Sequence, residues 1–311
     1  MLALKALSQQ PESMTGMSIP NYAIPLMGTI LLPNKYPPKQ LLNFTKLNLR
    51  SMQMKSKIVA SIEARMTSSR LPGKVLMPAT SEASMLEYMI HSVKQSRLID
   101  DIIVATTVNE TDQPIVELCN KLGVKYYRGS EDDVLLRVLE AHKSIDSKII
   151  VELTGDCPLI DAQIVDKIIQ IYLDNDYDYV SNSHVRSYPD GFDVQVFSVD
   201  CLEDVSNSKN EQYDRENVSS YIYRSDKYKL DAVIADKELF WPDLRVTLDD
   251  TGDYKLIKSI IENLEPKHHN KFKALDVVQL LKSRPELLQL NKDARISNAP
   301  YQTIADKPDN G

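Results

Sequence analysis

From residue 57 onward, apolar segments typical of strands alternate with amphipathic segments typical of helices. This alternation predicts an α/β domain with a mostly parallel sheet and helices on both faces. Strands are predicted at 57–62, 101–106, 124–128, 148–154 and 177–182, and helices at 84–96, 111–123, 132–144 and 161–175. Thr111 and Asp161 are the expected N-caps of the second and fourth helices, and Gly123 is the expected end of the second.

After residue 182 the alternation becomes less regular, which predicts a mixed sheet. Extended segments are expected at 192–198, 228–235 and 244–250, and helices at 213–225, 249–264 and 272–283.

The two ends of the chain differ from this central part. Prolines at 11, 20, 25, 33, 37 and 38 interrupt residues 1–54, and no period persists there. We therefore expect an irregular or disordered extension over 1–54, with a docking arm as the alternative. The catalytic domain is expected to span 55–282, and residues 283–311 are expected to form a C-terminal tail.

Charge and cysteine content exclude several classes of protein. The formal net charge of −7 does not favour binding to duplex nucleic acid. No apolar stretch is long enough to span a bilayer, so no membrane partner is expected. Cys119, Cys157 and Cys201 are too few and too far apart for a disulfide framework or a metal-ligand pattern, which indicates a reducing, cytoplasmic setting.

In a mostly parallel sheet, ligands bind beyond the carboxyl ends of the strands, which points to the loops at 63–74, 106–111, 128–133 and 154–160. The first of these, ARMTSSRLPGK at 64–74, concentrates cations directly after a strand. Arg65 and Arg70 can grip phosphoryl oxygens with two hydrogen bonds each, and Lys74 supplies a mobile charge. Gly73 allows the backbone to approach a ligand closely.

The spacing of this loop does not identify a known phosphate motif. It matches neither the Walker A pattern G-x-x-x-x-G-K-[ST] nor the dinucleotide pattern G-x-G-x-x-G. A basic turn that is solvated by water remains the alternative on spacing alone.

Two further loops carry carboxylates after expected strands. Asp156 lies in the turn TGDCP, where it could hold Mg²⁺ or simply close the turn. Asp249 and Asp250 follow the segment LRVTL, so that one could bind a metal while the other caps the next helix. Cations for polyphosphate and two separated aspartates for magnesium together indicate phosphoryl or nucleotidyl transfer.

Several motifs occur in order and at natural spacing: IEARMTSSRLPGK, YRGSEDDVLLR, VELTGDCPLID, YVSN, YPDGFDVQVFS, DRENVSSYI and RVTLDDTGDY. As a set, they resemble the spore coat polysaccharide biosynthesis cytidylyltransferase-like family, which is related to the 3-deoxy-manno-octulosonate and acylneuraminate cytidylyltransferases. The resemblance covers 57–264, and the segment at 284–301 resembles that family's C-terminal part.

The resemblance implies a nucleotide-diphospho-sugar transferase fold, a Rossmann-like three-layer sandwich of the GT-A type. It implies that CTP and a 2-keto-3-deoxy sugar acid give a CMP-sugar and pyrophosphate, for surface polysaccharide biosynthesis. It also implies that the segment at 183–226 shapes the sugar pocket and contributes to a homodimer.

By position, the resemblance assigns three sets of residues. Catalysis is assigned to Arg65, Lys74, Asp156 and Asp249. The nucleotide is assigned to Ala64, Arg65, Ser69, Arg70, Gly73, Lys74, Arg128 and Asp156, with Arg128 at the base. Magnesium is assigned to Asp156 and Asp249.

The chain departs from the family pattern at several positions. Glu63 stands where the family commonly has Gln, and Glu152 stands where it commonly has Arg. Both changes make the predicted nucleotide cleft more acidic and leave the choice of nucleotide open. Asn217 replaces a frequent His, and Asp250 and Gly252 also differ, which leaves open which aspartate binds the second metal.

Two other functions are compatible with the same fold. A glycosyltransferase that uses a finished nucleotide sugar usually carries Asp-x-Asp at its metal site, whereas this chain has Gly-Asp-Cys-Pro. A non-catalytic nucleotide-binding relative is favoured by Glu63 and Glu152, and is opposed by the presence of both expected metal carboxylates.

Overall fold

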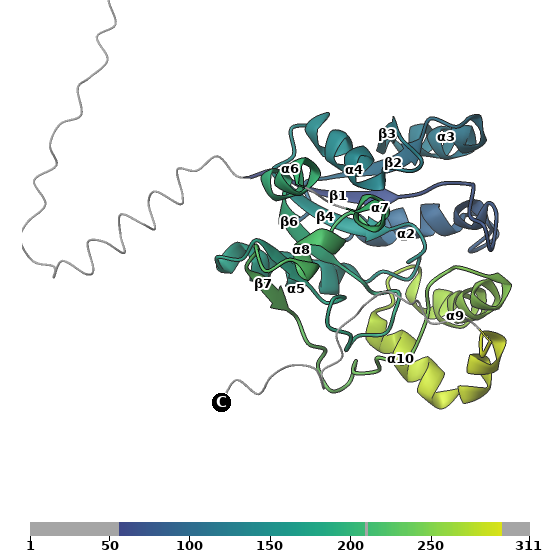
Figure 1. Cartoon of the computed structure of the whole chain (residues 1–311). Coiled ribbons are helices and arrows are strands. Elements are labelled where there is room, and N and C mark those ends of the chain that lie inside the picture. Colours follow the sequence, from purple (N-terminus) through teal and green to yellow (C-terminus); the bar gives the residue numbers. More distant parts are fainter. Residues whose placement is uncertain (1–55, 209–210, 294–311) are drawn as a thin grey trace, which may run out of the picture. The chain divides into compact units, whose positions relative to one another are not determined.

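The strand β1 (Ile58–Glu63) lies inside a central sheet and directs alternate side chains to its two faces. Ile58, Ala60 and Ile62 belong to one hydrophobic cluster, and Val59 belongs to a second. A computed structural model describes residues 56–208 and 211–293 of the chain, and Figure 1 shows their arrangement. The prediction for residues 1–54 lies outside the described residues.

Seven strands in the described ranges form one sheet in the order β3-β2-β1-β4-β6-β5-β7. Only β6 runs antiparallel to its neighbours, β4 and β5, among these strands. The other strands are β2 (Asp101–Thr107), β3 (Lys125–Gly129), β4 (Ile149–Thr154), β5 (Tyr179–Ser181), β6 (Gln195–Ser198) and β7 (Leu230–Ala232). The predicted mixed, mostly parallel sheet is confirmed.

Helices cover both faces of the sheet and complete a three-layer α/β domain (Figure 1). On one face the larger cluster packs residues of α2 (Met85–Val93), α3 (Gln113–Leu122), α5 (Ala162–Asp174), α9 (Thr251–His268) and α10 (Ala274–Ser283). On the other face the second cluster packs residues of α4 (Val134–Lys143), α6 (Val199–Asn207) and α8 (Ser220–Arg224).

Two predicted helix ends are confirmed, and one predicted cap is wrong. Asp161 caps α5 by accepting a hydrogen bond from the Gln163 backbone at 2.8 Å. Gly123 ends α3 with a φ of 61°. Thr111 does not cap α3, because the short 3-10 helix η2 (Glu110–Asp112) precedes it and makes Asp112 its N-cap residue.

Two predicted elements differ in the structure. The helix expected over 213–225 is divided into α7 (Gln212–Glu216) and α8, and Val218 between them has a φ of 38°. The segment at 244–250 is not a sheet strand; it forms only an isolated bridge between Asp190 and Arg245.

The segment at 244–250 instead pairs with loops at the carboxyl edge of the sheet. The Val246 backbone N–H donates to the Asp190 carbonyl at 2.7 Å, and the Leu248 N–H donates to the Asp156 carbonyl at 2.8 Å. Its apolar alternation therefore reflects burial against loops, with Val246 and Leu248 both 0% exposed. These bonds fix the end of the segment beside the turn that carries Asp156.

Part of the expected C-terminal tail packs on the domain. The 3-10 helix η3 (Pro285–Leu290) contacts α9 and α10. Asn291 then donates from Nδ2 to the Arg245 carbonyl and to Asp253 Oδ1, both at 3.1 Å. The described structure thus continues past residue 282 as far as residue 293.

The three cysteines are all free and buried. None of the helices in the described part of the chain combines the length and the apolar character that a bilayer crossing requires.

Candidate active site

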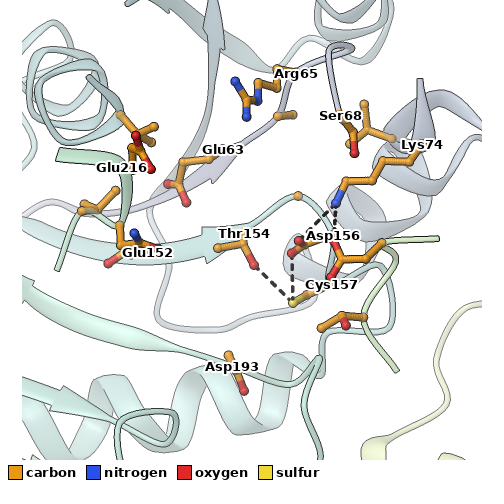
Figure 2. Close-up of a pocket in the computed structure, with 18 of the residues that line it drawn as sticks. Glu63, Arg65, Ser68, Lys74, Glu152, Thr154, Asp156, Cys157, Asp193 and Glu216 are labelled. Atoms are coloured by element: carbon orange, nitrogen blue, oxygen red, sulfur yellow. Dashed lines mark hydrogen bonds and ion pairs between the residues drawn. The ribbon is translucent and has the colours of Figure 1, made fainter. Parts of the chain in front are cut away.

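A cavity of about 620 Å³ lies at the carboxyl ends of β1 and β4. Its lining includes most of the residues that the sequence singled out, from the loop at 63–74, the turn at 154–157 and the segment at 245–249. Figure 2 shows Lys74 of the loop at 63–74 directed toward Asp156 of the turn at 154–157. The structure therefore brings together groups that are far apart in the sequence.

The loop after β1 is held in a tight conformation by backbone hydrogen bonds. The Gly73 N–H donates to the Met66 carbonyl at 2.8 Å, and Gly73 has a φ of 73°, which favours glycine. The Met66 N–H donates to Asp112 Oδ1 at 2.8 Å, which anchors the loop to the neighbouring η2. Gly73 thus shapes the turn, while the cavity itself is lined by Ala64, Arg65, Ser68, Ser69, Arg70 and Lys74.

Lys74 lies between the two aspartates that the sequence assigned to magnesium. Its Nζ is 3.2 Å from Asp156 Oδ2 and 2.8 Å from Asp249 Oδ1 (Figure 2 shows Lys74 and Asp156). The Lys74 side chain is only 12% exposed. Burial alone would lower the pKa of Lys74, but the charges of Asp156 and Asp249 raise it above its ordinary value.

The neighbouring Lys74 ammonium in turn favours the ionised form of the Asp156 carboxyl group. Burial would raise its pKa, but the charge of Lys74 and hydrogen bonds from Thr154 and Lys74 lower it below the usual range. Asp156 thus stays ionised within a polar pocket, and its side chain is 27% exposed. A partly exposed carboxylate of this kind remains able to exchange its present cation for a ligand.

Asp249 is surrounded by three cations. Besides Lys74, Arg70 Nη2 lies 3.0 Å from Asp249 Oδ2, and Arg245 donates to the same oxygen. Arg245 also donates to Asp253 Oδ2 at 3.1 Å, which fixes its guanidinium. Sequence analysis did not single out Arg245, because a spacing of four residues does not indicate an ion pair in a segment predicted to be extended.

The two adjacent aspartates, Asp249 and Asp250, occupy different environments in the structure. Asp249 faces the cavity, whereas Asp250 accepts from the Asp253 backbone at 2.9 Å and caps α9 in a reciprocal capping box. Of the two, only Asp249 lines the cavity, so only Asp249 is placed to contact a ligand there, and its assignment to a metal stays a prediction.

Arg128, assigned to the nucleotide base, does not line this cavity in the described structure. Its guanidinium donates to the Thr107 carbonyl at 2.9 Å and to the Asn109 carbonyl at 2.7 Å. Arg128 thus holds the loop after β2 in place. Its role at the base stays a prediction that this geometry does not support.

Arg65 forms an ion pair at the rim of the cavity. Its Nη1 is 2.9 Å from Glu131 Oε1, and Glu131 also accepts from Thr67 at 2.5 Å and from Asn109 at 2.6 Å. The Arg65 side chain is 46% exposed, so this pair is weak and can be replaced by a ligand at small cost.

The opposite part of the cavity is acidic. Ser61 of β1 lies opposite Glu152 of β4, and Glu63 follows two residues later, so Glu63 and Glu152 point to the same face. Burial and the charge of Glu152 raise the pKa of Glu63, and burial raises the pKa of Glu152 to about 8. Figure 2 shows both glutamates on the side of the cavity away from Lys74 and Asp156.

The raised pKa of Glu152 predicts a measurable pH dependence of stability. The folded protein keeps a proton that the unfolded chain releases above its ordinary value of 4.5, so this stabilising contribution is lost as pH rises toward about 8. We expect the wild type to lose more unfolding free energy than Glu152→Gln between about pH 5 and pH 8. Urea unfolding at several pH values measures this, with the exposed-residue variant Glu203→Gln as control. Equal slopes for all three proteins would contradict it.

A glycine at the end of β4 allows the two strand ends to approach. The Gly155 N–H donates to the Glu63 carbonyl at 2.9 Å, and a Cβ on Gly155 would lie 2.5 Å from that same oxygen. We expect Gly155→Ala to lower the unfolding free energy by about 1–3 kcal/mol, because backbone atoms must move. The same shift would move Asp156 relative to Lys74. Urea unfolding and nucleotide binding measure the two effects, and wild-type values for both would contradict this packing.

Comparisons with known proteins identify the family and the fold. The family model described as "Cytidylyltransferase" matches residues 59–282. The spore coat polysaccharide biosynthesis protein SpsF of Bacillus subtilis is 32% identical over 236 residues, which cover 74% of this chain and 95% of that protein.

Two solved structures resemble the fold. A cytidylyltransferase from Leptospira borgpetersenii superposes with a TM-score of 0.70 at 30% identity, covering 79% of this chain and 100% of that one. The CMP:2-keto-3-deoxy-manno-octonic acid synthetase in complex with CTP superposes with a TM-score of 0.52 at 17% identity, covering 67% and 99% of the two chains. At that identity, the second likeness concerns the fold alone.

Proposed function

The chain belongs to the cytidylyltransferase family, and we propose that it transfers the CMP group of CTP to a sugar acid of the 2-keto-3-deoxy type. Pyrophosphate is the second product. The likeness to a protein of spore coat polysaccharide biosynthesis supports a role in making a surface polysaccharide. The resemblance to 3-deoxy-manno-octulosonate cytidylyltransferases supports the choice of a sugar acid.

The observation that carries this proposal is the meeting of the cationic loop and two carboxylates in one cavity. Arg70 and Lys74 come from the loop after β1, Asp156 from the turn after β4, and Asp249 from a segment almost one hundred residues later. Their present ion pairs are with one another. A triphosphate can replace these pairs, because its oxygens are strong acceptors for fixed cations.

In the proposed reaction, a hydroxyl oxygen of the acceptor attacks the α-phosphorus of CTP. The bond between the α-phosphorus and the bridging oxygen breaks, pyrophosphate leaves, and the hydroxyl proton is released. Arg65, Arg70 and Lys74 neutralise the charge that develops on the leaving pyrophosphate. Ser69, in the same loop, offers a hydroxyl that can donate to a phosphate oxygen.

Magnesium is proposed as the metal of this site. The donor set in the structure consists of the Asp156 and Asp249 carboxylates, with Lys74 between them. The described residues contain no group of three or more His, Cys, Asp or Glu side chains that could hold a metal by themselves. Two carboxylates fit Mg²⁺, which commonly uses one or two of them together with substrate phosphates. When bound, the ion would neutralise charge on the triphosphate.

Pyrophosphate release is the direct test of this function. Purified protein is incubated with CTP, UTP, ATP or GTP, with a panel of 2-keto-3-deoxy sugar acids, and with either Mg²⁺ or EDTA. We expect release that requires CTP, a sugar acid and Mg²⁺ together. Release of UDP or CMP from nucleotide sugars would instead indicate a glycosyltransferase. Absence of pyrophosphate with every nucleotide, from well-folded protein, would exclude the proposed activity.

A further inference from the structure

The acidic part of the cavity contains a buried carboxyl group with an oxygen that has no hydrogen-bond partner among the described residues. Glu152 is 3% exposed, it lines the cavity, and its Oε2 has no hydrogen-bond partner among the described residues. The Oε1 atom of Glu63 is likewise without a partner in that part of the chain. Neither glutamate takes part in an ion pair with another described residue. A buried polar atom without a hydrogen-bond partner is costly, so this arrangement indicates a ligand group that donates hydrogen bonds to these oxygens.

The charge balance around the two glutamates indicates the sign of that group. Arg137 of α4 lines the same region and is the nearby cation that acts on Glu63. Its guanidinium donates to the carbonyls of Ser130 and Glu131, which holds it against the loop before α4. Burial raises the pKa of both glutamates, so both favour the protonated form near pH 7, whereas a bound cation would favour their ionised forms. Arg137 alone would offset only one of the two charges of the ionised pair. One negative charge is then left for a ligand to balance.

No further described cation lies beside the two glutamates to supply a positive charge. Asp193 is already paired with Arg186 at 2.6 Å, and Glu216 contributes a further negative charge at the exposed side of the cavity. Gln195 lies opposite Glu152 in the sheet, but its Oε1 accepts from Tyr179 and Ser219. The described cations that line the cavity, other than Arg137, come from the loop at 65–74 and from Arg245.

We propose that the acceptor carries a protonated amino group, and that Glu152 and Glu63 select for it. This rests on the proposed function, because the amino group belongs to the molecule that receives CMP. The triphosphate needs cations and is drawn to the loop at 65–74, whereas an ammonium is drawn to the opposite part of the cavity. The cytosine base is neutral near pH 7, so it supplies no positive charge that would favour the ionised forms of the two glutamates. An ammonium can donate to both carboxylates, since it carries three N–H donors.

The absence of a matching positive charge also disfavours an acceptor whose anionic group lies beside Glu152. An ionised Glu152 would repel a carboxylate placed beside it. A sugar acid is therefore accepted with its carboxylate elsewhere in the cavity and its amino group toward Glu152.

The test uses acceptors in sets of three that carry an amino, a hydroxyl or an acetamido group at the same carbon. Each set consists of 2-keto-3-deoxy sugar acids that differ only in this group. Pyrophosphate release from CTP gives kcat and KM for each acceptor. We expect the amino member of the accepted set to have a KM at least ~10-fold lower than the other two.

Two variants separate selection from general damage to the site. Glu152→Gln keeps the shape of the side chain and should remove most of the amino preference while leaving the KM for CTP unchanged. Glu63→Gln should reduce the preference in the same direction. Glu203→Gln removes an exposed carboxylate that pairs with Lys143 at 2.5 Å, and it should retain the full preference.

The possible outcomes distinguish this inference from the proposed function. Release with hydroxyl or acetamido acceptors at an equal or lower KM overturns the amino selection but leaves the cytidylyltransferase function intact. A higher KM for CTP in Glu152→Gln, with acceptor preference unchanged, places the glutamates at the base and also overturns it. No release with any acceptor overturns both proposals.

Discussion

Replacing Asp156 with alanine is expected to lower kcat/KM for CTP by about 10²–10³-fold or more, while the fold stays intact. Asp156 is the carboxylate at the tip of β4 that approaches both Lys74 and the cavity. Its backbone carbonyl, which accepts from the Leu248 N–H, is unaffected by the substitution. Steady-state pyrophosphate release measures the loss, and circular dichroism with urea unfolding verifies the fold.

Two further variants test whether the effect comes from the charge of Asp156. Asp156→Asn keeps the side-chain volume but removes the charge, so it should lose nearly as much activity if the carboxylate neutralises or positions a cation. Asp236→Ala removes a 70% exposed aspartate that pairs with Lys167 outside the cavity, and it should retain wild-type rates. Near-normal turnover by Asp156→Ala would show that the proposed metal assignment is wrong.

The sequence predicted much of the fold because its periodic segments are long. The residues of α2 at 85, 86, 89, 90 and 93 all prove to be buried, as the helical spacing requires. It did not predict that 244–250 pairs with loops, because buried alternation looks the same whether the partner is a sheet strand or a loop. The sequence also did not predict the break between α7 and α8, because a positive φ such as that of Val218 is unusual for a β-branched residue.

The candidate site could be predicted only in part. The positions of Lys74, Asp156 and Asp249 followed from strand ends and from motifs, because parallel strands bring their carboxyl ends to one edge. Arg245 escaped because it lies in the segment interpreted as a strand, where an arginine is commonly a surface residue. The arrangement of Glu63 and Glu152 depended on the pairing of β1 with β4, and register of this kind is set by tertiary contacts.

Replacing Lys74 with alanine is expected to raise the KM for CTP and to lower kcat, with kcat/KM reduced by about 10²-fold or more. Its ammonium lies between Asp156 and Asp249. Of the three cations in the loop at 65–74 that form ion pairs, Arg65, Arg70 and Lys74, the Lys74 side chain is the least exposed. Without it, the pyrophosphate loses a fixed positive charge. Initial rates over a range of CTP concentrations separate the change in KM from the change in kcat.

The same substitution should affect magnesium in the opposite direction. Once Lys74 is gone, Asp156 loses its cation, while Asp249 keeps Arg70 and Arg245. With the Asp156 carboxylate freed, the site should bind Mg²⁺ more tightly in the absence of nucleotide than the wild type does, as isothermal titration calorimetry can measure. Lys121→Ala removes a 63% exposed lysine that pairs with Glu87, and both its CTP and its Mg²⁺ affinity should match the wild type. If Lys74→Ala leaves the KM for CTP and the Mg²⁺ affinity unchanged, the ammonium does not share its position with the triphosphate and its metal, and the proposed site is wrong.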